Sequence, residues 1–457
     1  MRLSFSALAL AAASIHAAAA AEENKTAGEV SKGAKVRTFD TSVLGVDKVK
    51  QFSGYIDNEE EDKHTFFWFF ESRGDPAKDP VTLWVEGGPA CSSMLGLLQQ
   101  VGPARINEKL QPEFNPFSWI NRTSMIFLDQ PANTGFSHTS KHVNTSIDAA
   151  KDVLTAMTTF LKQFPEYAKQ DFYVSGTSYS GHFVPAIAAE ILSKPESDIN
   201  LKGAIIGNGL TDPKVQFPAF RPMGCGEGGI PAVFNESACA ALEAAEPVCK
   251  ELLQECSEKE ESETCLNAFG QCFAKPLSLK PGLNVYDLRK PCLGNSSNFC
   301  TDNVEPIVEW LNLAEVQKAL GVEVVEKWET CNSTTGADVQ RTGDGAKSLQ
   351  KQVVQLLEKK IPVLVFAGDG DYICNWLGNR DWTNALEWSG REAFNKAETK
   401  ALSVASDGKE KEYGNIKSAD GLSFVRIFDA GHFAIRDQSE GTLDLVDRFM
   451  KGELKGN

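Results

Sequence analysis

Positive charge is scarce in this chain of 457 residues, in which 46 Lys and Arg stand against 62 Asp and Glu for a formal net charge of −16. Such a surface repels the phosphates of nucleic acids and anionic membrane surfaces, so neither is expected as a partner. After the N-terminal segment no run of about 18 apolar residues occurs, which argues against a membrane span. The acidity is typical of a protein kept soluble by its charge.

Metal-binding patterns are also missing. The chain has no C-x-x-C pair and no Cys/His cluster with zinc spacing, and it contains only six histidines. We therefore expect no metal, and no organic cofactor is implied either.

Eleven cysteines are present, and eight of them lie between Cys225 and Cys300. This density predicts a disulfide-bonded region formed in an oxidising compartment, and the odd total predicts at least one free thiol. Six N-x-S/T sequons agree with a secretory route, and about half of them are expected to be glycosylated. The six acceptors are Asn24, Asn121, Asn144, Asn235, Asn295 and Asn332.

The N-terminus begins with Met1 and Arg2, continues through an apolar, alanine-rich run and becomes polar at Glu22. A positive start, a short apolar stretch and small residues predict a signal peptide over residues 1–20. Residues 21–40 are interpreted as a short N-terminal extension.

Buried-strand patterns alternate with helical ones, such as 147–163 and 346–359, which predicts an α/β protein with a mostly parallel sheet covered by helices on both faces. The predicted strands are Val81–Glu86, Ser124–Leu128, Asp171–Val174, Lys202–Ile206, Ile361–Ala367 and Ser423–Phe428. Residues 211–302 break this rhythm with charged helical stretches and most of the cysteines. We interpret them as a cap inserted between two parts of the core, 41–210 and 303–457.

The strand that ends at Val174 runs into Gly176-Thr177-Ser178-Tyr179-Ser180 and then into a predicted helix, 182–192. A strand, a sharp turn flanked by small residues and a helix are the context of a nucleophile elbow in the α/β-hydrolase fold. The pattern makes Ser178 the candidate nucleophile, although G-x-S-x-G has serine at its last position here.

A serine nucleophile needs a neighbouring base, and His432 is the best placed histidine because it follows a buried strand near the end of the chain. The alternatives are His16 in the signal, His64, His138, His142 and His182, the last interpreted as a packed core histidine. The third triad member lies in chain order between Ser178 and His432, where Asp369 and Asp371 both follow a strand. Either aspartate fits the pattern.

Acyl chemistry also needs donors for a negative oxygen. The N–H of Tyr179 is one candidate, and the turn Gly87-Gly88-Pro89 can present the second.

Several stretches together make the chain similar to the serine carboxypeptidase family from about Leu44 to Phe449. They are FFWFFESRGDPAKDPVTLW, NPFSW, FLDQP with GFS, GNGLTDP, CGEGG, NVYDLRKPC and AGDGDYICNWLGN. The resemblance implies that Asp371 is the triad aspartate and that the N–H groups of Gly88 and Tyr179 form the oxyanion hole. It also implies that Cys374 is a free thiol lining the substrate site. The disulfides that it implies are Cys91–Cys331, Cys225–Cys239, Cys249–Cys272, Cys256–Cys265 and Cys292–Cys300.

The chain departs from the family where the substrate carboxylate is bound. The family uses an Asn in W-x-N-G-G-P-G and two glutamates, and the matching residues here are Glu86, Gln100 and Thr177. Trp84 and Gly87 are retained, Ala90 replaces the last glycine, and Phe433 replaces the usual Met after the base.

An ionised Glu86 would oppose a substrate carboxylate by roughly 4 kcal/mol at about 4 Å and an effective dielectric near 20. A protonated Glu86 would instead donate a hydrogen bond, and burial raises the pKa of a carboxyl toward that state. We therefore predict peptidase activity confined to acidic pH, or a shifted substrate.

The resemblance implies a serine-type carboxypeptidase acting on peptides through an acyl-enzyme. The alternatives are an acyltransferase or esterase on the same scaffold, and a non-catalytic protective or binding partner. The family's vacuolar member carries a long propeptide, whereas here only about fifteen to twenty residues separate the predicted signal from the first strand-like segment. Extracellular export is therefore expected, with a vacuole or lysosome-like compartment as the alternative.

Overall fold

A computed structural model describes residues 34–293, 299–301, 303–322, 327–406 and 408–454. The predicted signal peptide, most of the N-terminal extension, Asn24 and Asn295 lie outside these residues. Among the described helices, none combines the length and apolar character that a membrane crossing requires.

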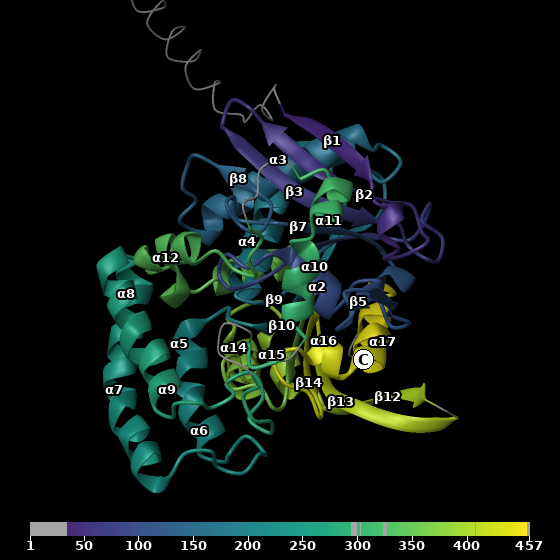
Figure 1. Cartoon of the computed structure of the whole chain (residues 1–457). Coiled ribbons are helices and arrows are strands. Elements are labelled where there is room, and N and C mark those ends of the chain that lie inside the picture. Colours follow the sequence, from purple (N-terminus) through teal and green to yellow (C-terminus); the bar gives the residue numbers. More distant parts are fainter. Residues whose placement is uncertain (1–33, 294–298, 302, 323–326, 407, 455–457) are drawn as a thin grey trace, which may run out of the picture.

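A twelve-stranded sheet forms the centre of the molecule (Figure 1). Its strands are β1 (Lys35–Asp40), β2 (Gln51–Asn58), β3 (Lys63–Phe70), β4 (Val81–Val85), β7 (Ser124–Leu128), β8 (His138–Thr139), β9 (Phe172–Ser178), β10 (Leu201–Gly209), β11 (Val363–Gly368), β12 (Lys400–Ser406), β13 (Lys409–Ala419) and β14 (Leu422–Ile427). The order is β1-β2-β3-β7-β4-β9-β10-β11-β14-β13-β12, and β8 pairs with β3. The six neighbouring strands β7, β4, β9, β10, β11 and β14 run parallel, so their carboxyl ends lie at one edge of the sheet. A separate hairpin joins β5 (Ala104–Ile106) to β6 (Pro112–Phe114).

Helices cover both faces of the sheet, because successive side chains of a strand point to opposite sides. On β9, Phe172 and Val174 belong to one buried cluster, whereas Tyr173 belongs to the other and lies edge-on to Phe449. The first cluster includes residues of α3 (Ser146–Gln163), α4 (Ser180–Ser193) and α13 (Gln350–Glu358). The second includes residues of α2 (Ser93–Gln99), α10 (Glu305–Leu311), α11 (Ala314–Leu320) and α17 (Ser439–Met450). Each large apolar side chain buried in these layers contributes about 1.5–3 kcal/mol.

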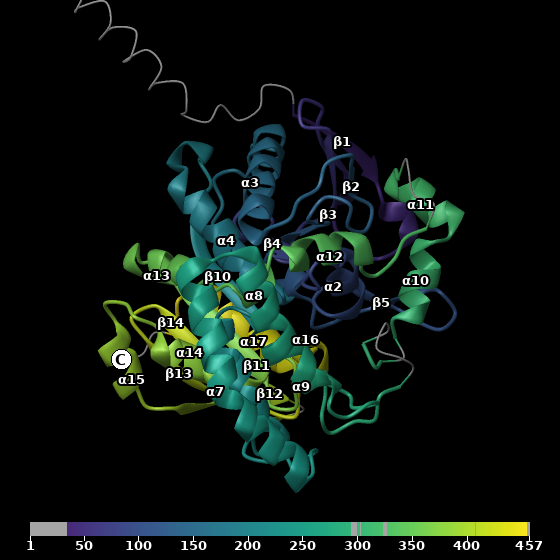
Figure 2. The same cartoon turned by 90° about the vertical axis from the view of Figure 1, so that its left-hand side faces the viewer.

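The chain between β10 and α10 forms helices and no strand within its described residues. They are α5 (Pro213–Gln216), α6 (Phe220–Gly224), α7 (Glu236–Lys259), α8 (Ser262–Phe269) and α9 (Lys275–Ser278). In Figure 2, α7, α8 and α9 lie in front of the strands, so this segment forms a layer of its own over the core. The disulfides Cys225–Cys239, Cys249–Cys272 and Cys256–Cys265 hold it together.

The remaining helices are α12 (Ser333–Arg341), α14 (Trp376–Ala385), α15 (Arg391–Lys396) and α16 (Ala434–Asp437). Cys91–Cys331 joins the turn after β4 to the residues before α12, and Cys292 pairs with Cys300. The five disulfides are the pairs that the family resemblance implied, and Cys374 is the free cysteine among the described residues.

The predicted α/β-hydrolase fold is confirmed by this parallel centre, its two helical layers and the order of its elements. Some predicted boundaries were wrong, and the strand predicted to end at Val174 continues as β9 to Ser178. The helix predicted over 346–359 begins at Gln350, because Lys347 has an extended backbone with φ −80° and ψ 146°.

Candidate active site

Ser178 is the last residue of β9 and is followed by α4 after a single residue. Its φ of 64° lies in the left-handed region, where a non-glycine residue is strained. A Cβ on Gly176 would lie 2.3 Å from the carbonyl oxygen of Val85 and 2.6 Å from Cβ of Ser180, so only glycine fits that position. The Ser180 hydroxyl donates to the Val85 carbonyl at 2.9 Å and fixes the bend. Small residues on both sides of Ser178 thus allow the sharp turn of a nucleophile elbow.

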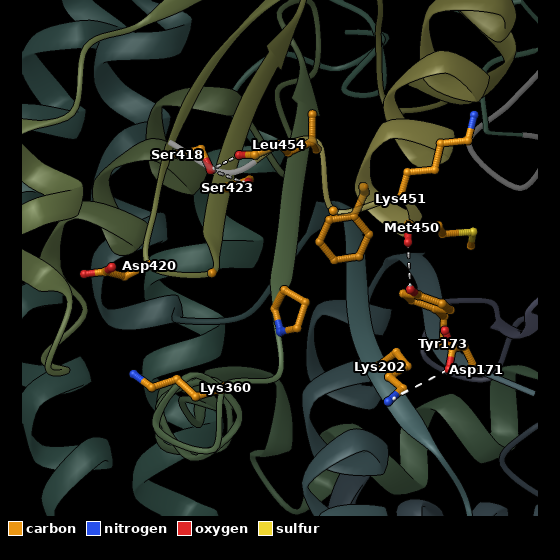
Figure 3. A pocket seen from close by; sticks show the side chains of 14 residues that line it. Asp171, Tyr173, Lys202, Lys360, Ser418, Asp420, Ser423, Met450, Lys451 and Leu454 are labelled. Carbon is orange, nitrogen blue, oxygen red and sulfur yellow. Dashed lines mark hydrogen bonds and ion pairs between the residues drawn. The ribbon is translucent and has the colours of Figure 1, made fainter. Parts of the chain in front are cut away.

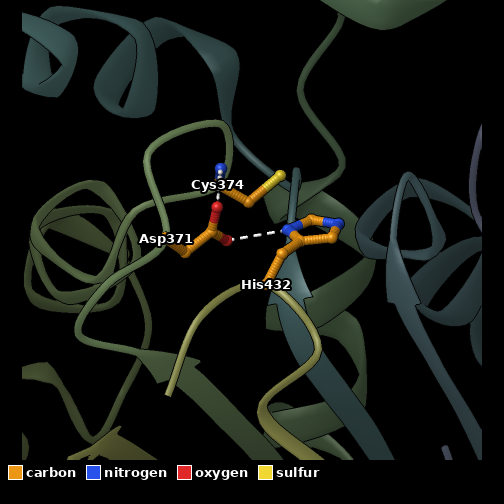
Figure 4. Close-up of side chains that lie close together, drawn as sticks. All are labelled: Asp371, Cys374 and His432. Carbon is orange, nitrogen blue, oxygen red and sulfur yellow. Dashed lines mark hydrogen bonds and ion pairs between the residues drawn. The ribbon is translucent and has the colours of Figure 1, made fainter. Parts of the chain in front are cut away.

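Asp371 and His432 form a buried pair (Figure 4). Nδ1 of His432 lies 2.8 Å from Oδ2 of Asp371, which leaves the other ring nitrogen pointing away from the carboxylate. Asp371 follows β11 and His432 follows β14, so both lie at the same sheet edge as Ser178. A carboxylate on one ring nitrogen fixes the tautomer in which the other nitrogen accepts a proton.

The structure distinguishes Asp369 from Asp371, which the residue pattern left as alternatives for the third triad member. Asp369 lies 3.4 Å from Arg289 and 3.6 Å from Arg426, and it accepts from the N–H of Ala430 at 3.3 Å. Asp371 is the one that contacts the His432 ring. Asp369 therefore has a structural role.

Asn208, which sequence reasoning missed, connects these residues. Its Nδ2 donates to Oδ2 of Asp371 at 2.8 Å and lies 3.4 Å from the carbonyl of Gly431. The next residue along β10, Gly209, pairs with Ser178 in the sheet register. The sequence showed Gly207-Asn208-Gly209 only as the end of a strand, although an asparagine at the carboxyl edge of a parallel strand could have marked it.

Tyr286 also contacts His432. Its carbonyl accepts from the backbone N–H of His432 at 2.7 Å, and its ring centroid lies 5.3 Å from the imidazole. Phe433 contacts both rings, with its centroid 6.0 Å from that of Tyr286 and 5.6 Å from the imidazole. Phe433 is buried and belongs to the packing around the imidazole.

The turn after β4 lies directly against the elbow. A Cβ on Gly87 would lie 2.5 Å from the amide nitrogen of Tyr179 and 2.8 Å from Cβ of Ser178. Gly88 has a φ of 115°, which only glycine adopts readily. The amides of Gly88 and Tyr179 therefore come from two segments that meet at Ser178, as an oxyanion hole requires.

Glu86 lies beside this turn and is 4% exposed. Its Oε1 accepts from the Thr177 hydroxyl at 2.8 Å, and its Oε2 lies 3.3 Å from Nε1 of Trp84. Burial raises the pKa of Glu86 to about 7, opposed in part by these donors and by the nearby His432. Gln100, at the end of α2, is 2% exposed.

Cys374 is buried beside Asp371, whose carboxylate accepts from the Cys374 backbone N–H at 3.3 Å (Figure 4). Burial, reinforced by the negative Asp371, raises the pKa of this thiol well above its usual value. Within the described residues, the set of metal-ligating side chains that converge is Asp371, Cys374 and His432. Two of these three already bind each other.

A cavity of about 740 Å³ lies at the opposite edge of the sheet, where β9, β10 and β11 begin (Figure 3). Tyr173 and Lys202 line it, and the Tyr173 hydroxyl donates to the carbonyl of Met450 at 3.3 Å. It contains none of the candidate site residues and is not part of this site.

Comparisons with known proteins agree with the geometry. The family model described as serine carboxypeptidase matches residues 43–452. "Carboxypeptidase Y homolog A" of Neurospora crassa is 48% identical over 422 residues, which span 92% of this chain and 75% of that protein. The protein of the same name from Arthroderma gypseum is 47% identical over 423 residues, with 92% and 77% covered. Among solved structures, Kex1(Δ)p, a prohormone-processing carboxypeptidase from Saccharomyces cerevisiae, has a TM-score of 0.77 at 25% identity, covering 92% of this chain and 96% of that chain. The chain therefore belongs to the serine carboxypeptidase family.

Proposed function

We propose that this protein is a serine carboxypeptidase that releases C-terminal amino acids from peptides through an acyl-enzyme on Ser178. The observation that carries the proposal is the buried Asp371–His432 pair at the same sheet edge as a serine held at a φ of 64°. Membership of the family supports peptide hydrolysis over acyl transfer, ester hydrolysis or a non-catalytic role.

The chemistry follows from the positions of these groups. Nε2 of His432 takes the proton of the Ser178 hydroxyl as its oxygen attacks the scissile carbonyl carbon. The amides of Gly88 and Tyr179 stabilise the negative oxygen that forms. His432 then gives its proton to the leaving amine as the C–N bond breaks. Water, activated by the same imidazole, hydrolyses the acyl-enzyme and frees Ser178.

Asp371 stabilises the imidazolium that appears in each step, and Asn208 holds Asp371 in place. Replacement of the aspartate of such a triad lowers turnover by about 10⁴-fold in serine proteases, and loss of the serine or the histidine lowers it by about 10⁶-fold. We assign substrate binding to the residues that surround the elbow. They are Trp84, Glu86, Gly87, Gln100, Thr177, Cys374 and Phe433.

The segment 211–302 is proposed to act as a cap that limits access to the sheet edge. Its contacts with the core support this role, because α8 packs on residues 344–346 and α5 packs on α14. Asp344 in that core loop accepts from the Tyr179 hydroxyl at 2.7 Å, so α8 of the cap packs on a loop that contacts the residue after the nucleophile.

We propose that the protein enters the secretory pathway and is exported, a vacuole-like compartment being the alternative. Five disulfides support an oxidising compartment. Among the sequons, the exposed Asn144 and Asn235 and the half-buried Asn332 suit glycosylation. Asn121 is a poorer acceptor, because its Nδ2 already donates to the carbonyl of Pro116 at 2.7 Å.

Digestion of a defined peptide at pH 5, followed by mass spectrometry, tests this function. We expect a ladder of products shortened from the C-terminus, lost in Ser178→Ala. Internal cleavage, or an unchanged ladder in that variant, would overturn the proposal.

A further inference from the structure

We propose that His182 is a positioning residue that carries protons on both ring nitrogens and that, in this charged form, holds the nucleophile elbow in its active shape. This histidine lies four residues after Ser178 and is not a member of the triad. The inference rests on the proposed function, because it concerns the reactivity of Ser178. It adds a second ionised group on which catalysis depends.

The ring of His182 is completely buried, and an acceptor faces each of its nitrogens. Nδ1 lies 2.6 Å from the carbonyl oxygen of Leu210, and Nε2 lies 3.1 Å from the carbonyl oxygen of Asp344. A carbonyl oxygen only accepts hydrogen bonds, and a neutral imidazole has a single N–H group. In a neutral ring, one nitrogen lone pair would therefore face an oxygen lone pair. Only the imidazolium donates to both carbonyls.

A buried positive charge needs compensation, and the surroundings of His182 provide it. The Tyr179 ring stacks on the imidazole with centroids 4.7 Å apart and an interplanar angle of 20°, which places the cation over an aromatic face. The Tyr179 hydroxyl donates to the Asp344 carboxylate at 2.7 Å, and the Ser146 hydroxyl donates to it at 2.5 Å. Both donors are neutral, so the negative charge of Asp344 remains to balance that of His182.

A second buried carboxyl, that of Asp212, lies close enough to interact with the charge of His182. Burial raises the pKa of Asp212, opposed in part by a hydroxyl donor, by Lys214 and by the positive His182. Among the described residues, the titratable groups that contact or act on the imidazole are therefore Tyr179, Asp344 and Asp212. Two of these three are carboxyls, so the surroundings favour a cation.

His182 acts on the elbow through the residue that follows β10. The Leu210 carbonyl accepts from Nδ1 of His182, and the Leu210 N–H donates to the carbonyl of Ser178 at 3.0 Å. A Cβ on Gly181 would lie 2.5 Å from both the nitrogen and the oxygen of Leu210, so α4 lies directly against this backbone. The face of the imidazole also supports Tyr179, whose amide belongs to the oxyanion hole. The charged ring therefore fixes the backbone at Ser178 and at Tyr179.

Loss of one ring proton at alkaline pH should then slow catalysis. His432 must be neutral to act as the base, so activity rises with pH until that residue is deprotonated. His182 must be charged, so kcat should fall again when His182 loses a proton. Cys374 and Tyr286 do not account for such an alkaline fall, because burial raises the pKa of both groups, that of Tyr286 to about 12.

The protonation state can be measured directly, because the chain has only six histidines. Selective isotope labelling of histidine, with long-range proton–nitrogen correlation spectra, distinguishes a ring with two N–H groups from a ring with one. We expect two protonated nitrogens on His182 at pH 6 and one after the alkaline fall of kcat. A neutral ring at pH 6 would overturn the inference, and this measurement needs only the wild-type protein.

Two variants that do not titrate separate the two contacts. The amide nitrogen of asparagine lies near the position of Nδ1 and that of glutamine near Nε2, so His182→Asn keeps a donor for Leu210 and His182→Gln keeps one for Asp344. Because Leu210 is bonded to Ser178, kcat should be about tenfold lower in His182→Gln than in His182→Asn, the effect of one hydrogen bond. KM should not change, and neither variant should show the alkaline fall.

The assay is the hydrolysis of an N-blocked amino-acid ethyl ester between pH 5 and 9, because this substrate has no terminal carboxylate to interact with Glu86. The alkaline fall should persist in Glu86→Gln, since burial raises the pKa of Glu86 to about 7 and this variant removes that titration. His138→Gln, which changes a half-buried histidine of β8 outside the site, is the control and should keep kcat and its pH dependence.

The outcomes separate the two proposals. Wild-type kcat and an unchanged alkaline fall in folded His182→Asn and His182→Gln would overturn the positioning role of His182 and leave the peptidase function standing. Failure of the wild type to hydrolyse the ester would instead overturn the proposed function.

Discussion

Replacement of Asn208 by glycine should slow catalysis without unfolding the protein. Asp371 accepts from Nδ1 of His432 at 2.8 Å, from Nδ2 of Asn208 at 2.8 Å and from the N–H of Cys374 at 3.3 Å. The change therefore removes one of the two short bonds that hold the carboxylate. Glycine is the suitable replacement because Asn208 has a φ of 42°, which alanine adopts only with strain.

A hydrogen bond to a charged group contributes about 1.5–3 kcal/mol. At 1.36 kcal/mol for each factor of ten, kcat/KM of Asn208→Gly should fall about ten- to 150-fold. Asp371 stabilises the imidazolium of the transition state and does not contact the bound substrate. The loss should therefore appear mainly in kcat and not in KM. Steady-state hydrolysis of an N-blocked dipeptide at pH 5, with a thermal melt of each protein, measures both quantities.

Two controls make the result specific. Asn115→Ala removes a buried asparagine that donates to the carbonyl of Gly102 at 2.9 Å outside this site, so it should lower stability and leave kcat unchanged. In an Asp371→Asn background, Asn208→Gly should cost little more, because no carboxylate remains to be held. A loss below threefold in the single variant, or full additivity with Asp371→Asn, would refute the positioning role of Asn208.

Other consequences can be measured in the same way. Gly87→Ala would place a methyl group 2.5 Å from the amide nitrogen of Tyr179 and should abolish turnover. The control Gly270→Ala, whose added methyl group would have no neighbouring atom within 4 Å, should be fully active. Equal activities of the two variants would contradict the close packing of the elbow. Burial raises the pKa of Glu86 from 4.5 to about 7. Proton binding to Glu86 therefore stabilises the folded state in acid, and this stabilisation is lost as the pH rises toward and through 7. Relative to Glu86→Gln, the unfolding free energy of the wild type should fall by about 3 kcal/mol between pH 4.5 and 7 in denaturant titrations, and a rise would show the sign to be wrong. Because burial raises the pKa of Cys374, iodoacetamide should alkylate it more slowly than free cysteine at pH 8 and rapidly after denaturation, which mass spectrometry can follow.

The sequence predicted those parts of the site that depend on local structure. A strand, small residues around Ser178 and a following helix are contiguous signals, and the structure places β9, the bend and α4 there. The strands that precede Asp371 and His432 were equally visible as apolar runs followed by glycine and aspartate.

Contacts between distant segments were not predictable from the residues alone. Asp369 and Asp371 follow the same strand two positions apart, and only the packing of Arg289 and Arg426 against Asp369 distinguishes them. The role of Asn208 depends on the register of β10 beside β9 and β11. The helix predicted over 346–359 also began four residues before α13, because nothing in the sequence marked the extended backbone at Lys347.

The central claim is that Ser178 is made nucleophilic by the Asp371–His432 pair. Reaction with a fluorophosphonate probe, followed by peptide mapping, tests it most directly. We predict one label per chain on Ser178, at a rate that falls by at least a hundredfold in His432→Ala while the thermal melt is preserved. A label on another residue, or an unchanged labelling rate in that variant, would contradict the claim.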